Sequence, residues 1–192
     1  MKVVGFIGSP RIKGNTATIV NEVLLGAREA GAETKVFNLN QLGIRGCQGC
    51  LKCQTPEGRC VQKDDMAPLY DEIYSADAVV IGTPVYMFQV TGQTKIFIDR
   101  LLAFLYLKDG KPGNFRNKLK GKKTVTVFSQ GQPDTSMFAS NFDLTEGVLS
   151  FLGFKVQERI VAGGMRGEDD AKGNAGILEM AYAAGVSLTK EG

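Results

Sequence analysis

The sequence predicts a three-layer α/β sandwich around a parallel five-stranded sheet in the order 2-1-3-4-5. Apolar runs typical of buried parallel strands alternate with amphipathic segments typical of helices, which implies right-handed crossovers. Small polar loops follow the first, third and fourth expected strands, and that order brings them to one crevice. At 192 residues, the chain is expected to form one domain over residues 1–192 with a sizeable core.

The expected strands differ in how apolar they are. The first and third are nearly continuous apolar runs, as expected for strands covered on both faces, whereas the second mixes polar and apolar residues like an edge strand. The expected strands are residues 2–8, 33–39, 78–82, 124–128 and 154–161.

Helices are expected between the strands, beginning after Asn15 or Thr16 as N-cap and after Asp64 or Asp65. The segment 94–107 would form a helix that is apolar around nearly its whole circumference, so it is expected to be covered by loops of the same chain or to face another subunit. A long polar loop that could act as a lid follows it at 108–121. The expected helices end near residue 31 and residue 75, or span 94–107, 142–152 and 169–189.

Composition limits the function. The 23 basic and 20 acidic side chains are spread along the chain and give a net charge of +3, so no nucleic-acid or membrane surface is expected. No apolar run approaches the ~20 residues of a membrane span and no targeting segment is recognised, so a cytoplasmic protein is expected. The chain has no histidine, which excludes His-based triads and His ligands. The chemistry must come mainly from a cofactor or from cysteines, and no catalytic side chain is assigned.

All four cysteines lie in a loop of about residues 40–62, after the second strand. Cys47, Cys50 and Cys53 form overlapping C-x2-C pairs, and Cys60 follows six residues later. Such crowding suits an iron-sulfur cube, in which each iron needs one thiolate. Zinc sites with four cysteines usually have two separated C-x2-C pairs, so zinc is the second interpretation and free or redox-active thiols the third. Disulfides are disfavoured in a reducing compartment.

The loop after the first strand is rich in groups that bind phosphate. Ser9, Arg11, Asn15 and Thr16 supply hydroxyls, a cation and an amide, Gly14 adds flexibility, and the following helix N-terminus adds free N–H groups. The loop lacks the Walker A and G-x-G-x-x-G patterns, so a monophosphate such as that of FMN fits better. A capped helix start is the plain alternative, and both can hold together.

The loops after the third and fourth strands are expected to border the same crevice. Residues 83–92 combine backbone donors, aromatic side chains and small residues, and can pack on a flat ring while hydrogen-bonding its edge. A turn into a helix is the alternative for this loop. The expected ring-binding residues are Pro84, Val85, Tyr86, Met87, Phe88, Ser129, Gln130 and Gly131. The cysteine loop would share this edge of the sheet.

Together these motifs resemble the flavodoxin-like NAD(P)H-dependent FMN reductase superfamily. The residues that carry the resemblance are Gly8-Ser9-Pro10-Arg11, Gly14-Asn15-Thr16, Thr83-Pro84-Val85-Tyr86, Thr91-Gly92-Gln93-Thr94-Lys95 and Phe97-Ile98-Asp99-Arg100, and they cover the chain to about residue 131. The compact cysteine motif is similar to that of the iron-sulfur flavoprotein branch of this superfamily.

The resemblance implies FMN and one [4Fe-4S] cluster, bound by the residues already singled out and by Cys47, Cys50, Cys53 and Cys60. It also implies a homodimer or homotetramer, a ferredoxin-type electron donor, and an acceptor such as dioxygen or hydrogen peroxide. Two other functions stay open. One is an NAD(P)H-dependent flavin or quinone reductase with a non-redox cysteine site. The other is a redox sensor or carrier that docks partners through the basic segment 108–123, for which a solvated face is the plain alternative.

Overall fold

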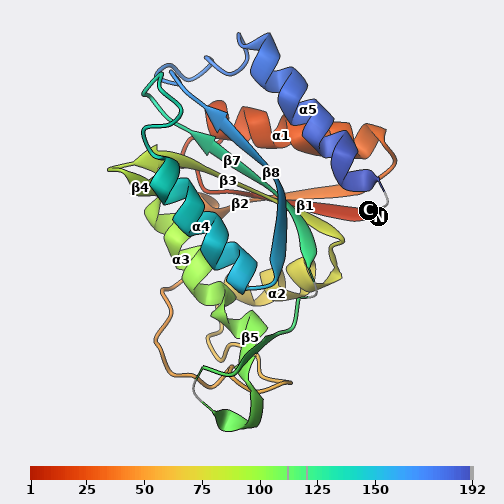
Figure 1. The fold of residues 1–192 in the computed structure, drawn as a ribbon, viewed down its shortest axis with the longest axis vertical. Helices are drawn as coiled ribbons and strands as arrows, with labels where there is room; N and C mark the ends of the chain where they lie inside the picture. The colour runs from red at the N-terminus through yellow and green to blue at the C-terminus, as the bar shows by residue number, and fades with distance from the viewer. Residues whose placement is uncertain (112, 120, 191–192) are drawn as a thin grey trace.

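The computed structural model describes residues 1–111, 113–119 and 121–190, and its centre is a parallel sheet (Figure 1). The strands lie in the order β2-β1-β3-β7-β8, which is the predicted order 2-1-3-4-5. Every neighbouring pair in this path is parallel. The strands are β1 (Lys2–Ile7), β2 (Glu33–Asn38), β3 (Ala78–Tyr86), β7 (Lys122–Ser129) and β8 (Phe154–Ala162). The predicted fold class is confirmed.

Helices cover both faces of this sheet, which gives the three expected layers (Figure 1). One core lies under α1 (Asn15–Glu29) and α5 (Ala175–Thr189). The second lies under α2 (Met66–Ser75), α3 (Gly92–Arg100) and α4 (Ala139–Phe151). Buried residues alternate between these cores along β1, where Val3 and Ile7 face the first and Val4 and Phe6 the second. This alternation explains why the strand is apolar throughout.

Several predicted boundaries were wrong. Strand β3 continues past residue 82 to Tyr86, because it folds back on the short strand β4 (Gln89–Val90) as an antiparallel hairpin. Helix α5 begins at Ala175, where Asn174 Oδ1 accepts a hydrogen bond from the N–H of Ile177. Gly14, not Asn15 or Thr16, occupies the N-cap position of α1, and it provides no side-chain cap.

The predicted helix 94–107 was also wrong in its second half. Helix α3 ends at Arg100 and passes through the 3₁₀ helix η2 (Leu101–Phe104) into β5 (Leu105–Leu107). Strand β5 pairs antiparallel with β6 (Phe115–Asn117), so the expected long loop contains a β-ribbon and the short 3₁₀ helix η3 (Lys108–Gly110). The apolar residues of η2 and β5 enter the chain's own second core, which favours the intramolecular explanation of their burial.

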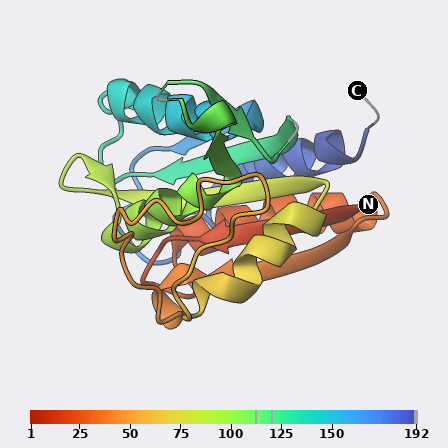
Figure 2. The same ribbon diagram turned by 90° about the horizontal axis from the view of Figure 1, so that it is seen from below.

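The β5–β6 ribbon projects from the sandwich beside the cysteine loop. Figure 2 views the molecule from this end, where the orange loop of residues 40–62 and the green ribbon both lie toward the viewer. The loop leaves the sheet through the 3₁₀ helix η1 (Leu39–Gln41). No helix within the described ranges has the length and apolar character needed to cross a membrane.

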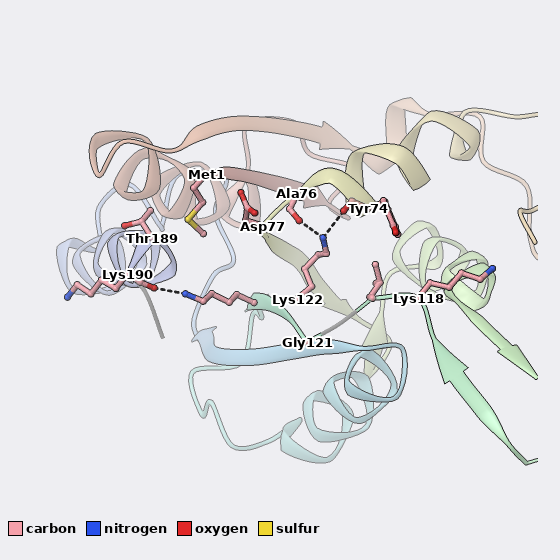
Figure 3. Close-up of a pocket in the computed structure, with 11 residues that line it drawn as sticks. Met1, Tyr74, Ala76, Asp77, Lys118, Gly121, Lys122, Thr189 and Lys190 are labelled. Carbon is pink, nitrogen blue, oxygen red and sulfur yellow. Dashed lines mark hydrogen bonds between the residues drawn. The ribbon is translucent and has the colours of Figure 1, made fainter. Parts of the chain in front are cut away.

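A large depression of about 830 Å³ lies at the amino-terminal edge of the sheet (Figure 3). Its lysines serve the fold. Lys122 Nζ donates to the backbone carbonyls of Tyr74 and Ala76 at the end of α2, and Lys123 Nζ donates to that of Lys190 after α5. Cations at helix C-termini satisfy carbonyls that have no partner within the helix. The bonds of Lys122 and Lys123 thus stabilise the ends of α2 and α5 at this edge of the sheet.

Candidate functional site: a flavin crevice and a cysteine cavity

The loop after β1 is held against the loop after β3 by a buried network of hydroxyl groups. Thr91 Oγ1 donates to the carbonyl oxygen of Gly8 at 2.7 Å, and Gln93 Nε2 donates to the same oxygen at 2.8 Å. Thr94 Oγ1 lies 2.8 Å from Thr91 Oγ1 and 3.1 Å from Thr83 Oγ1. A Cβ at Gly8 would lie 1.8 Å from Thr94 Oγ1, so the network requires glycine there.

The predicted phosphate residues surround the start of α1. Ser9 and Thr16 are buried, and Arg11 is exposed. Ser9 Oγ accepts a hydrogen bond from the N–H of Arg11 at 3.1 Å, which shapes the turn. Thr16 Oγ1 lies 2.6 Å from Ser129 Oγ and joins this loop to the one after β7. The first N–H groups of a helix lack partners within the helix, so the start of α1 provides donors for an anion.

Asn15 has a structural role that the sequence did not reveal. Its Nδ2 donates to the carbonyl of Gly167 at 2.6 Å, and its Oδ1 accepts from the N–H of Ala171 at 2.9 Å. The side chain therefore fixes the segment before α5. Both ends of the side-chain amide have partners within the chain, and the predicted contact of Asn15 with phosphate stays a prediction.

The predicted ring loop is the β3–β4 hairpin. Its turn residues Met87 and Phe88 have φ angles of 47° and 67°, a left-handed conformation that non-glycine residues adopt at a cost. Pro84 is buried, Val85 is half-buried, and Met87 is 90% exposed. The hairpin thus presents large apolar side chains at the rim of the crevice.

An open depression of about 320 Å³ joins this hairpin to the loop after β7. It is lined by Val85, Met87, Phe88, Gly131, Gln132, Met137, Phe138 and Arg166. Pro84 pairs with Ser129 in the β3–β7 register, so the two loops lie side by side. Gln130 is buried and its Nε2 donates to the carbonyls of Gln132 and Asp134, so its side chain stabilises its own loop. The predicted ring residues therefore do come together.

The four cysteines line one small cavity. Cys47 and Cys50 are exposed and Cys53 and Cys60 half-buried, and Arg100, Leu102 and Ala103 form the cavity's inner wall. In the described part of the chain, no three Cys, Asp or Glu side chains converge closely enough to hold a single metal ion. A cube separates its ligands more than one zinc ion does, because each thiolate binds a different iron. The four thiols and their spacing along the chain fit an iron-sulfur cube.

A buried ion pair closes the base of the cysteine loop. Arg100 Nη1 lies 2.6 Å from Asp64 Oδ2, and Arg100 Nη2 lies 3.1 Å from Asp64 Oδ1. Asp64 Oδ2 also accepts from the N–H of Arg45, and Arg100 Nη1 donates to the Arg45 carbonyl. Burial raises the pKa of Asp64, but these hydrogen bonds outweigh it and leave that pKa below its ordinary value. The pair joins the two ends of the loop to the end of α3.

A second clamp comes from the ribbon. Lys118 Nζ donates to the carbonyls of Gly58 at 2.5 Å and Ala103 at 2.9 Å, and lies 3.4 Å from that of Cys53. Burial lowers the pKa of Lys118, although the neighbouring Cys53 raises it. Gln54 Nε2 donates to the carbonyls of Leu102 and Leu105. The ribbon and η2 therefore hold the loop between Cys53 and Cys60.

These contacts correct two predictions. The cysteine cavity does not lie at the edge of the sheet where the predicted FMN loops meet. Arg100, the last residue of α3, and residues of η2 form its wall, so it lies at the C-terminal end of α3. The segment 108–123 is not a simple solvated face, because Lys118, Lys122 and Lys123 all bond to backbone carbonyls. Lys108, Lys111 and Arg116 are exposed, and Lys120 lies outside the described residues. Arg100 was detectable as a lone cation at the end of an apolar run, whereas the role of Lys118 had no sequence signal.

Comparison with known proteins finds both FMN reductases and iron-sulfur flavoproteins among the relatives of this chain. A family model described as NADPH-dependent FMN reductase matches residues 1–168. An iron-sulfur flavoprotein of Archaeoglobus fulgidus is 33% identical over 172 residues, covering 88% of this chain and 74% of that protein. One from Methanocaldococcus jannaschii is 44% identical over 105 residues, and this match spans 55% of the chain and about half, 52%, of that relative.

Solved structures agree on the fold. An NAD(P)H:quinone oxidoreductase from Methanothermobacter marburgensis superposes with a TM-score of 0.75 at 19% identity, covering 98% of each chain. That identity supports the fold alone, and the family assignment comes from the sequence matches. The predicted recognition is confirmed: the chain belongs to the NADPH-dependent FMN reductase family of FMN-dependent oxidoreductases, in its iron-sulfur flavoprotein branch.

Proposed function

We propose that this protein is an electron-transfer oxidoreductase that binds FMN in the crevice and one [4Fe-4S] cluster in the cysteine cavity. The observation that carries the proposal is the meeting of all four cysteines in one cavity, on a chain whose family is that of FMN reductases. When bound, FMN would exchange one or two electrons and the cluster one. The protein itself binds, spaces and shields the two groups.

In the flavin crevice, Ser9, Arg11 and the N–H groups of Asn15 and Thr16 would hold the phosphate. Arg11 would supply the opposite charge, and the start of α1 the donors. The ring would lie against Pro84 to Phe88 and against Ser129 to Gly131. The exposed apolar side chains of the β3–β4 hairpin would then exclude water from one of its faces.

In the cysteine cavity, Cys47, Cys50, Cys53 and Cys60 would each bind one iron. The loop is clamped at its base by Asp64 with Arg100 and near Cys53 by Lys118. These clamps would fix the positions of the thiolates before iron binds, which lowers the entropy lost on assembly of the site.

Iron, acid-labile sulfide and flavin content test the proposal directly. Anaerobically purified protein should contain about four irons and four sulfides per chain together with one FMN. Replacing Cys53 by alanine should remove the broad visible absorbance of the cluster and leave the flavin bands. Protein that contains zinc, or neither iron nor sulfide, would refute the cluster.

A second candidate function is direct reduction of FMN by NAD(P)H. The observation that favours it is the open depression of about 320 Å³ beside the ring loop, whose apolar wall could receive a nicotinamide against the flavin. Rapid bleaching of the flavin by NADPH in iron-free protein would support this function. Bleaching only by a reduced ferredoxin-type donor would support the first.

We also propose that the protein is a homodimer or homotetramer. Leu144, Val148 and Phe151 form an exposed apolar stripe along α4, at the i, i+4, i+7 spacing of one helix face. Leu144→Lys should dissociate the assembly, as measured by light scattering, whereas a monomeric wild-type protein would contradict the proposal.

A further inference from the structure

Arg100 has one nitrogen whose role the fold does not explain. Its side chain is 1% exposed, and both terminal nitrogens have acceptors in Asp64 and Arg45. Nε is buried and has no acceptor among the described residues. A buried donor without a partner is costly and uncommon, which suggests that a bound group supplies the acceptor for Nε.

The way in which Asp64 binds Arg100 leaves this nitrogen available. The carboxylate pairs with Nη1 and Nη2, at the end of the guanidinium, and not with the side that carries Nε. Arginine has five N–H donors in a rigid fork, so the orientation fixed by Asp64 also fixes the direction of the Nε–H bond.

Arg100 belongs to the wall of the cavity that all four cysteines line. Of the other polar side chains of that wall, Gln48 Nε2 and Gln62 Nε2 each donate one hydrogen bond to the carbonyl of Gly46. Apart from the four cysteines, the remaining wall residues are apolar. Arg100 thus brings a buried N–H donor without a hydrogen-bond partner among the described residues to the wall of this cavity, where the expected acceptors are sulfur atoms.

We propose that Arg100 Nε–H donates a hydrogen bond to a sulfur of the [4Fe-4S] cluster or of one of its cysteine ligands, and thereby raises the reduction potential of the cluster. The inference rests on the proposed function, since it needs the cluster. Hydrogen bonds to the sulfurs stabilise the more negative, reduced state. Because Asp64 neutralises the guanidinium charge, the effect comes from the directed bond and not from an added net charge.

Two single variants separate this role from simple support of the fold. Arg100→Lys keeps a cation for Asp64 but removes Nε, so the cluster potential should fall. At the wild-type midpoint, the ratio of reduced to oxidised cluster should drop at least tenfold, which is 59 mV for one electron. Asp64→Asn keeps Nε–H and leaves the guanidinium charge uncompensated, so it should raise the potential. Loosening of the loop would move both variants in the same direction.

A double variant protects the test against poor folding of either single one. Arg100→Met with Asp64→Asn removes the donor and both charges together, so the local net charge equals that of the wild type. Its potential should fall as in Arg100→Lys. Cluster potentials are measured by redox titration with electron paramagnetic resonance, and the FMN potential in the same titration should stay constant.

The outcomes distinguish the inference from the proposed function. Wild-type protein without iron and sulfide overturns both. Wild-type and variant proteins with full clusters and equal potentials overturn only the hydrogen bond. A fall in both Arg100 variants together with a rise in Asp64→Asn supports it.

Discussion

Removal of the Asp64 carboxylate should be the most destabilising single change at the cysteine loop. In Asp64→Ala, the guanidinium of Arg100 stays buried without its counter-charge, and the N–H of Arg45 loses its acceptor. Both side chains are at most 5% exposed, so water can replace little of the lost interaction. Removing one partner of such a buried pair costs about 3–5 kcal/mol.

This loss should be large enough to measure by thermal or urea unfolding of the metal-free protein. For a chain of this size, 1 kcal/mol corresponds to roughly 2–4 °C in Tm, so Asp64→Ala should melt roughly 6–20 °C below the wild type. Metal-free protein is used because bound iron would add its own stabilisation.

Asp99→Ala provides the matched control. Asp99 forms an ion pair with Lys95 in the same helix α3, but the two side chains are 44% and 61% exposed. Exposed i,i+4 pairs contribute about 0.3–0.5 kcal/mol. If Asp64→Ala cost no more than Asp99→Ala, the buried pair would not be the clamp described here.

Three further substitutions or conditions test other parts of the molecule. Gly8→Ala should weaken FMN binding, measured by flavin fluorescence, because the added Cβ would overlap Thr94 Oγ1. In the control Gly92→Ala, the added Cβ has no atom within 4 Å, so this variant should bind FMN as tightly as the wild type. Lys118→Met should release iron to a chelator several-fold faster than wild type, because it leaves the carbonyls of Gly58 and Ala103 without this donor. A buried acceptor without a hydrogen bond costs about 1–3 kcal/mol. Equal rates of iron release would contradict the clamp. The lowered pKa of Asp64 gives stability that is present above about pH 4 and lost as pH falls through the folded-state pKa, so wild type should lose more unfolding free energy on acidification than Asp64→Ala.

The sheet and its loops were predictable because their signals are local. Apolar runs bounded by glycine and polar loops specify buried strands, and their alternation with helices indicates a parallel sheet. The order 2-1-3-4-5 is one that brings the polar loops after the first, third and fourth strands to one crevice. The ring loops after β3 and β7 then meet without any further information, as the Pro84–Ser129 pairing illustrates.

The β5–β6 ribbon was not predictable in the same way. Residues 94–107 are apolar on every side, so periodicity cannot distinguish one long helix from a helix followed by a buried strand. Pairing between Leu105 and Asn117 crosses a segment of polar residues that carries no pattern of its own. The inward direction of Lys118 depends on the carbonyls of the cysteine loop, which are distant in sequence.

Helix α3 connects the two proposed sites and keeps them apart. Its N-terminal cap, Thr91, belongs to the flavin crevice, and its last residue, Arg100, belongs to the cysteine cavity. Nine helical residues span on the order of 12 Å from first to last. Electron exchange within one chain would have to pass from one end of this helix to the other, whereas exchange between subunits would depend on contacts such as the α4 stripe. Dissociation by Leu144→Lys therefore distinguishes the two paths. Electron exchange between cluster and flavin should persist in the monomer if it runs within one chain, and should stop if it runs between subunits.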